Sequence, residues 1–150
     1  MRVIKNINNN VSLCVDSSGR ELIAFGKGIG FKRPPYELSL EQVDRTFYNI
    51  DSIYLSMIGA IPEKIISIVA RAVDYARVKL ENPVSSNIVV TLADHINFAV
   101  ERHRKHMNIS LPIVHDVQHL FETEYEIGER TLALIRRELG VDLPEEEASY

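Results

Sequence analysis

The chain has little cysteine and no long apolar run among its 150 residues. Its one cysteine, Cys14, cannot form an internal disulfide, and the absence of a signal-like N-terminus also favours a reducing cytoplasm. No segment approaches the roughly 20 apolar residues that span a bilayer, so we expect no membrane insertion. Nucleophile motifs, phosphate loops and cofactor fingerprints are missing too, so we expect no enzyme and no cofactor.

The composition is that of an ordinary globular protein, with 45% hydrophobic and 25% charged residues. The length allows one domain or two small ones. The net charge of −4 is unevenly distributed, because residues 1–35 carry a net charge of +4 and residues 36–150 carry −8. This separation of charge indicates that the N-terminal part binds a polyanion and that the acidic remainder of the chain keeps the protein well solvated.

Residues 1–50 have the alternating pattern of short strands. We predict four strands, over residues 3–7, 11–15, 20–25 and 42–49, with hairpin turns at Asn8–Asn10 and Asp16–Gly19. Asparagine suits the first turn because it tolerates left-handed backbone and can bond to its own chain. Four short strands bury little apolar surface, which favours dimerisation through one face.

From about residue 53 the apolar period becomes helical. We predict four helices: one starting at Pro62-Glu63, one capped by Ser86 or Asn87, one after Pro112, and one from Thr123 to Gly140. Residues 50–60 are a linker or a short first helix. The predicted fold class is therefore α+β, a small four-stranded antiparallel β domain followed by an all-α helical bundle.

The first domain concentrates residue types that suit RNA. Asparagines offer donors and acceptors to base edges, glycines let the main chain approach phosphates, and an aromatic ring can stack on a base. The residues with these properties are Lys5, Asn8, Asn10, Gly26, Gly28, Lys27, Phe31, Lys32 and Arg33. The alternative is a plain β-meander in which asparagine and glycine merely make tight turns.

The histidines allow more than one interpretation. His95 is either a functional residue or an ordinary helix histidine bonded to Asp94 or to solvent. An enzyme with Asp94 and His95 as an acid–base pair is a competing hypothesis. The pairs His103/His106 and His115/His119 are spaced for a metal, but no carboxylate or cysteine completes either set, so we expect no metal site.

Several motifs resemble a known family. INNNV at 7–11 and FGKGIGF at 25–31, separated by an acidic hairpin turn, resemble the N-terminal co-antiterminator RNA-binding (CAT) domain of the BglG/SacY-type transcriptional antiterminators. The later segments are similar to that family's first phosphotransferase-system regulation domain (PRD), and they are IPEKIISIVARAVDYARVKL at 61–80, LADHINFAVER at 92–102 and YEIGERTLALI at 125–135. The resemblance divides the chain into a CAT domain at 1–52 and a PRD at 53–150.

The resemblance implies a dimeric, cytoplasmic activator that binds a nascent-mRNA antiterminator hairpin and prevents formation of a terminator upstream of sugar-utilisation genes. The RNA-contacting positions that it implies are Lys5, Asn8, Asn10, Gly26, Lys27 and Phe31. The family's loop after this point is rich in glycine and lysine, whereas this chain has Lys32-Arg33-Pro34-Pro35.

The resemblance also implies control by phosphorylation. It places His95 on the first regulatory histidine, which phosphotransferase-system proteins (a sugar permease component and the phosphocarrier protein) would phosphorylate. LPEEEASY at 143–150 is similar to the segment shortly before the second regulatory histidine, so we expect a C-terminally incomplete first PRD. The alternative function is a phosphorylatable protein-binding signalling module without RNA binding.

Overall fold

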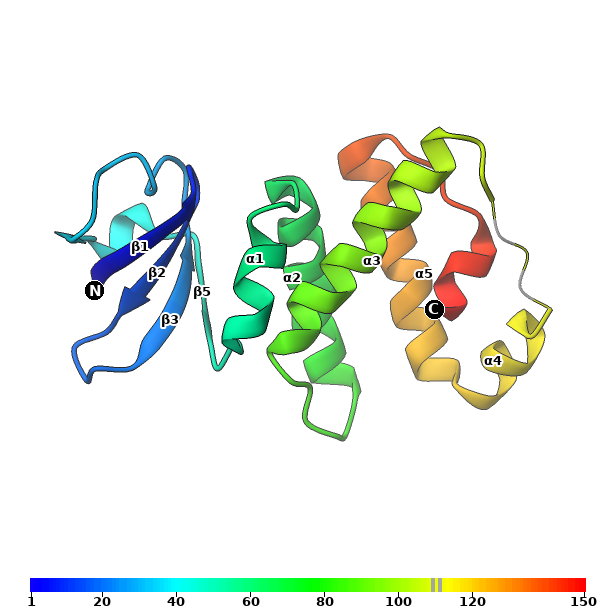
Figure 1. Ribbon diagram of the computed structural model, residues 1–150. Helices are drawn as coiled ribbons and strands as arrows, with labels where there is room; N and C mark the ends of the chain where they lie inside the picture. The colour runs from blue at the N-terminus through cyan, green and yellow to red at the C-terminus, as the bar shows by residue number, and fades with distance from the viewer. Residues whose placement is uncertain (109, 111) are drawn as a thin grey trace. The chain divides into compact units, whose positions relative to one another are not determined.

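Residues 1–108, 110 and 112–150 are described by the computed structural model, in which the chain divides into two units, Met1–Ile61 and Pro62–Tyr150 (Figure 1). The first unit contains the strands and the second contains the long helices. The predicted fold class, an antiparallel sheet followed by a helical region, is confirmed.

The sheet of the first unit is antiparallel and has five strands in the order β4-β1-β2-β3-β5. The strands are β1 (Arg2–Asn8), β2 (Val11–Val15), β3 (Glu21–Phe25), β4 (Tyr36–Glu37) and β5 (Arg45–Tyr48). The prediction of four strands is wrong by one. The missed strand, β4, has only two residues, so it shows no alternation, and it directly follows two prolines that indicate a break.

One face of the sheet carries a closed apolar core. Its buried members are Val3, Cys14, Leu22, Ala24, Ile29 and Leu38. Ile29 comes from the loop after β3 and not from a strand, so this core anchors the loop to the sheet. Burial raises the pKa of the Cys14 thiol to about 11, which keeps this cysteine protonated and unreactive at neutral pH.

The β2–β3 hairpin is built around the Asp16 carboxylate. Its Oδ1 accepts hydrogen bonds from the backbone N–H of Ser18 at 2.8 Å and of Arg20 at 3.0 Å, and from the Ser18 hydroxyl at 2.7 Å. Its Oδ2 accepts from the Tyr48 hydroxyl at 3.1 Å. The Ser18 hydroxyl bond is the largest of several contacts that together hold the pKa of Asp16 well below its usual range.

We expect Asp16→Asn to lower stability at pH 7 and to lower it by a clearly smaller amount at pH 2.5. The folded-state pKa is depressed, so the ionised carboxylate stabilises the fold above the ordinary value of 3.8, and this contribution is lost as the pH falls through the folded-state value. Thermal unfolding at the two pH values measures the difference. Glu21→Gln, at an exposed neighbouring carboxylate, is the control. An equal Asp16→Asn effect at both pH values contradicts the assignment.

The helical part comprises α1 (Leu55–Ile58), α2 (Glu63–Lys79), α3 (Asn87–Arg104), α4 (Val114–Leu120) and α5 (Glu122–Leu139). The start of α2 after Pro62 and the end of α5 at Gly140, which has the left-handed φ of 67°, agree with the prediction. In the described part of the chain, no helix is long and apolar enough to cross a membrane.

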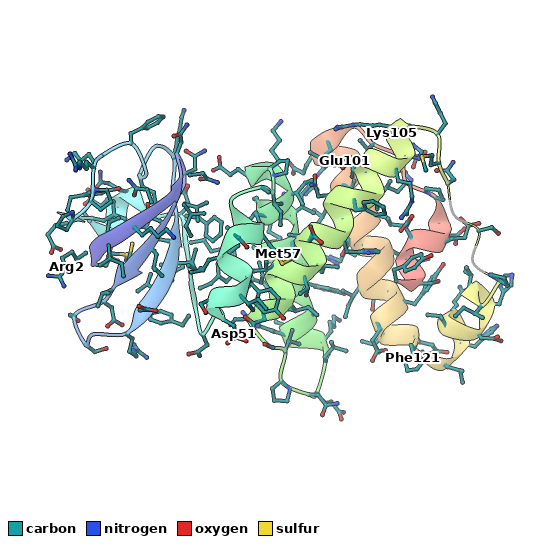
Figure 2. The ribbon with its side chains drawn as sticks, in the orientation of Figure 1. Arg2, Asp51, Met57, Glu101, Lys105 and Phe121 are labelled. Atoms are coloured by element: carbon teal, nitrogen blue, oxygen red, sulfur yellow. The ribbon has the colours of Figure 1, made fainter. Side chains whose placement is uncertain are left out.

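The prediction that Thr123 caps the last helix is wrong. Phe121, labelled in Figure 2, both ends α4 and precedes α5. Its carbonyl accepts the N–H of Tyr125 at 2.8 Å. Ser86 does precede α3, but its side chain makes no capping hydrogen bond. At the start of α3 the neighbouring Ser85 hydroxyl accepts the N–H of Asn87 at 3.3 Å instead, whereas α5 begins on the backbone of Phe121.

The second unit is held together by α2, whose buried face packs against both α3 and α5. A final 3₁₀ helix (Glu145–Ser149) lies against α5 near α4, at the red end of the chain in Figure 1. This contact is close, because a Cβ atom at Gly128 of α5 would collide with the carbonyl oxygen of Ala148. The C-terminal segment is thus part of the folded unit.

Candidate nucleic-acid interface and regulatory histidine

The loop between β3 and β4 lies directly against the β1–β2 turn. Gly26 N–H donates to the Asn10 carbonyl and Gly30 N–H to the Asn9 carbonyl, both at 3.0 Å. The side chain of Asn10 completes the contact, because its Oδ1 accepts the N–H of Gly28 at 2.8 Å. Two segments about twenty residues apart in sequence therefore form one surface.

Glycine is required at two positions of this contact by close approach of the backbone. A Cβ atom at Gly30 would collide with the carbonyl oxygen of Asn8, and one at Gly26 would collide with the carbonyl oxygen of Gln42. Gly28 adds a positive φ of 73°, which L side chains rarely adopt. The first role of these glycines is therefore to let the loop pack closely against the backbone at Asn8 and at Gln42.

The turn itself is closed by an asparagine that bonds to its own backbone. Asn8 Oδ1 accepts the N–H of Asn10 at 2.8 Å, as the sequence predicts. The turn does not use the tolerance of asparagine for left-handed backbone, since the described residues other than glycine with positive φ are Asn49 and His106. Side-chain bonding alone thus explains asparagine at the turn.

Asn6 ties the far end of the loop to the sheet, and sequence reasoning missed it. Its Oδ1 accepts from the buried Ser12 hydroxyl at 2.9 Å and lies 3.1 Å from the Tyr36 hydroxyl, which also contacts the Ile29 carbonyl. Its Nδ2 donates to the Lys32 carbonyl. Asn6 lies inside the same asparagine-rich run as Asn8 and Asn10, which is the signal that could have identified it.

The structure brings together most of the residues predicted to contact RNA. Asn8, Asn10 and Gly26 belong to the contact between the turn and the loop, and Phe31 follows it with 72% of its surface exposed. Lys27 is exposed within the loop, and Lys5 is exposed on β1, opposite Leu13 of β2. Gly26 differs from the others, because it is buried and its N–H is already bonded to Asn10.

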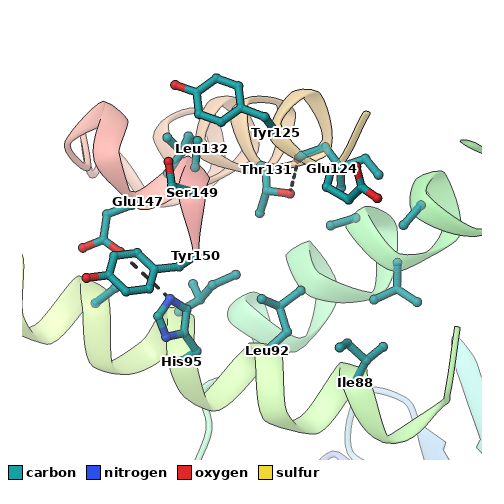
Figure 3. A pocket seen from close by; sticks show the side chains of 18 of the residues that line it. Ile88, Leu92, His95, Glu124, Tyr125, Thr131, Leu132, Glu147, Ser149 and Tyr150 are labelled. Atoms are coloured by element: carbon teal, nitrogen blue, oxygen red, sulfur yellow. Dashed lines mark hydrogen bonds and ion pairs between the residues drawn. The ribbon is translucent and has the colours of Figure 1, made fainter. Parts of the chain in front are cut away.

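His95 lies on α3 with its side chain 35% exposed, facing the C-terminal segment. Its Nε2 is 3.9 Å from Oε2 of Glu147, and its ring is 5.3 Å from the ring of Tyr150, measured between centroids (Figure 3). The carboxylate that faces this histidine is therefore that of Glu147, and not that of its sequence neighbour Asp94, which is exposed.

Glu147 is a buried carboxylate. Its side chain is 7% exposed and its Oε1 forms an ion pair with the guanidinium of Arg102, which is 9% exposed. An acidic run after a proline, such as residues 145–147, is most simply a solvated helix start, but Glu147 is buried, and Arg102 provides the charge partner that a buried carboxylate needs.

An apolar cavity of about 450 Å³ lies beside this group, between α2, α3, α5 and the last residues of the chain (Figure 3). His95, Glu147 and Tyr150 border it, and most of the remaining lining is aliphatic, such as Leu92 and Leu132.

The other histidines lie elsewhere. His103 contacts Asn108, and His115 and His119 are exposed on α4. No group of three potential metal ligands occurs among the described residues.

Two family models match the chain. A CAT RNA binding domain matches residues 1–53, and a PRD domain matches residues 64–150. The chain belongs to the BglG-type antiterminator family, in which a CAT domain precedes a PRD domain. The first of these domain types binds RNA and the second is regulatory, so the family consists of regulators and not of enzymes.

Curated relatives and a solved structure support the same family. The chain is 29% identical to the transcription antiterminator LicT of Bacillus subtilis, 31% identical to the beta-glucoside operon antiterminator of Dickeya chrysanthemi and 28% identical to the protein GlcT of Staphylococcus aureus. All or nearly all of this chain is covered, at 99–100%, but only 54–56% of each relative, so the chain spans about half of their length. A crystal structure of GlcT CAT-PRDI superposes with a TM-score of 0.78 at 25% identity, covering 99% of this chain and 92% of that one.

Proposed function

We propose that residues 1–52 bind an mRNA antiterminator hairpin as a dimer, and that this binding prevents formation of a terminator ahead of sugar-utilisation genes. Residues 53–150 would control this activity through phosphorylation of His95 by proteins of the sugar phosphotransferase system. The observation that supports the RNA-binding proposal most is the contact between the β1–β2 turn and the 26–31 loop, which presents polar, cationic and aromatic groups together.

Each proposed contact uses a group that suits RNA. Asn8 and Asn10 lie at the turn, where amides can reach base edges or ribose hydroxyls, and the exposed ring of Phe31 offers a stacking surface. Lys5 and Lys27 supply exposed positive charge for phosphates. Gly26 is buried, so we propose that it acts indirectly. Its close approach to the Gln42 carbonyl fixes the backbone position from which the Lys27 side chain extends.

We expect hairpin binding to weaken with salt in proportion to the number of lysines and arginines engaged. With Lys5, Lys27, Lys32 and Arg33 of both protomers in contact, about eight charges are engaged, and the slope of log affinity against log salt should be about −6 to −7. Lys27→Ala removes one charge from each protomer and should make that slope shallower by roughly 1.5 to 2 units. Gel-shift titrations from low to high salt with an antiterminator-like hairpin measure both.

Lys64→Ala, at an exposed lysine of α2, is the matched control and should leave the slope unchanged. A hairpin that fails to bind even at low salt would favour the alternative function, a protein-binding signalling module. A Lys27→Ala slope equal to that of the parent would remove this lysine from the proposed surface.

The regulatory proposal rests on the position of His95. Its ring is partly exposed, so a protein donor can reach it, and it faces groups on a different element, so a new charge there affects more than α3. A phosphoryl group adds about two negative charges and strong acceptor oxygens. Incubation with the phosphorylated phosphocarrier protein, followed by mass spectrometry at neutral pH, tests modification at His95.

A further inference from the structure

The Glu147 carboxylate is shared between two basic residues of α3. One oxygen, Oε1, pairs with Arg102, while the other, Oε2, is 3.9 Å from Nε2 of His95. Oε2 is buried and has no hydrogen-bond partner among the described residues. A buried carboxylate oxygen without a partner is costly, so an arrangement of this kind needs an explanation.

We propose that this is a phosphoryl-binding site, in which Arg102 binds the phosphoryl group carried by His95, and Glu147 occupies that place in the unmodified protein. The inference rests on the proposed phosphorylation of His95. It identifies Arg102 as the residue that binds the phosphoryl group and Glu147 as the residue that this group displaces.

The geometry of α3 allows Arg102 this role. His95 and Arg102 are seven residues apart, so they lie on the same face of the helix, about 10.5 Å apart along its axis. The guanidinium already extends to the carboxylate that faces His95. It also lies 5.4 Å from the centre of the Phe98 ring, which helps to orient it. A planar guanidinium is well suited to bind two phosphate oxygens at once.

Phosphorylation at Nε2 would force the exchange. The Nε2 lone pair of the neutral imidazole forms the new N–P bond while the N–P bond of the donor breaks, and the electron pair of the broken bond leaves with the donor's nitrogen. The proton on Nδ1 of His95 then passes to solvent. The phosphoryl oxygens then occupy the space that Oε2 holds, and both groups are negatively charged. Glu147 is displaced, and Arg102 exchanges one anion for another.

Displacement of Glu147 has a structural consequence within the second unit. Glu147 lies in the 3₁₀ helix that packs against α5 through Ala148 and borders the apolar cavity through Ser149 and Tyr150. Releasing its ion pair loosens this segment and uncovers apolar lining. Phosphorylation of His95 would in this way expose the apolar lining of the cavity to solvent.

Phosphoramidate tests the proposal, because it phosphorylates histidine chemically and releases ammonia, without any phosphotransferase-system protein. The initial rate of modification at His95 is followed by mass spectrometry at neutral pH. Glu147→Gln removes the competing charge and should raise the rate about tenfold. Adding Arg102→Gln to Glu147→Gln, which keeps the pair uncharged and avoids a buried lone charge, should lower the rate about tenfold relative to Glu147→Gln alone.

Matched controls remove a neighbouring charge of the same sign. Glu146→Gln and Arg104→Gln should behave as the parent. Hydrogen exchange at residues 145–150 should rise when the parent is phosphorylated. A Glu147→Gln rate equal to that of Glu146→Gln, a double variant equal to Glu147→Gln, or no His95 modification in either the parent or Glu147→Gln would each overturn the proposal. Failure of the phosphocarrier protein alone, with the phosphoramidate series as expected, would refute only the proposed donor.

Discussion

Gly30→Ala should reduce hairpin affinity by about 100-fold or more and should also destabilise the first unit. The added Cβ atom would collide with the carbonyl oxygen of Asn8, a backbone atom that cannot rotate away. The loop must therefore lift from the turn, which breaks the hydrogen bond from Gly30 to Asn9 and moves Phe31. Loss of one stacked base together with the contacts around it supports this magnitude, and steric overpacking of this kind destabilises by about 1–3 kcal/mol.

Gly19→Ala is the matched control for this substitution. Gly19 has a φ of 83° and open space around it, so alanine there costs about 1–2 kcal/mol of backbone strain but touches no neighbour. It lies in the β2–β3 hairpin and outside the proposed surface. Titration of the labelled hairpin and thermal unfolding of both variants separate the two effects. Parent-like hairpin affinity in folded Gly30→Ala would show that the loop does not contribute to binding.

The order and positions of most strands and helices were predictable from the sequence. Alternation identified four strands, and apolar stripes identified α2, α3, α4 and α5, because both signals repeat over several residues. Features with no repeat were missed. The strand β4 is two residues long, and the start of α5 depends on the backbone of Phe121, which has no side-chain signature.

The candidate site was predictable by residue type but not by role. Gly26 was expected to let the chain approach phosphates, whereas in the fold it approaches the backbone of Gln42. The sequence shows that a close approach is needed and does not show to which partner. The same limit applies to Glu147, because an acidic run after a proline predicts solvation, and only the fold brings Arg102 to it.

Phe31→Ala should weaken hairpin binding by roughly 5- to 150-fold, which corresponds to the 1–3 kcal/mol of one stacked base. Phe31 is 72% exposed, so its removal should leave the free energy of unfolding within about 0.5 kcal/mol of the parent. Phe31→Tyr keeps an aromatic face and should bind almost as the parent does. Ile53→Ala, at a residue 74% exposed in the same unit, is the control for loss of exposed apolar surface.

Asn10→Ala should differ from Phe31→Ala in its effect on stability, and this difference tests the proposed RNA-binding surface more strictly. Asn10 Oδ1 holds the N–H of Gly28, so its loss should weaken hairpin binding and also lower stability by about 1 kcal/mol. The pair of variants therefore separates an exposed contact from a contact that also positions the loop. If both variants bind the hairpin as the parent does, the proposed surface is wrong. If Phe31→Ala loses stability as much as Asn10→Ala, its ring serves the fold and not the RNA.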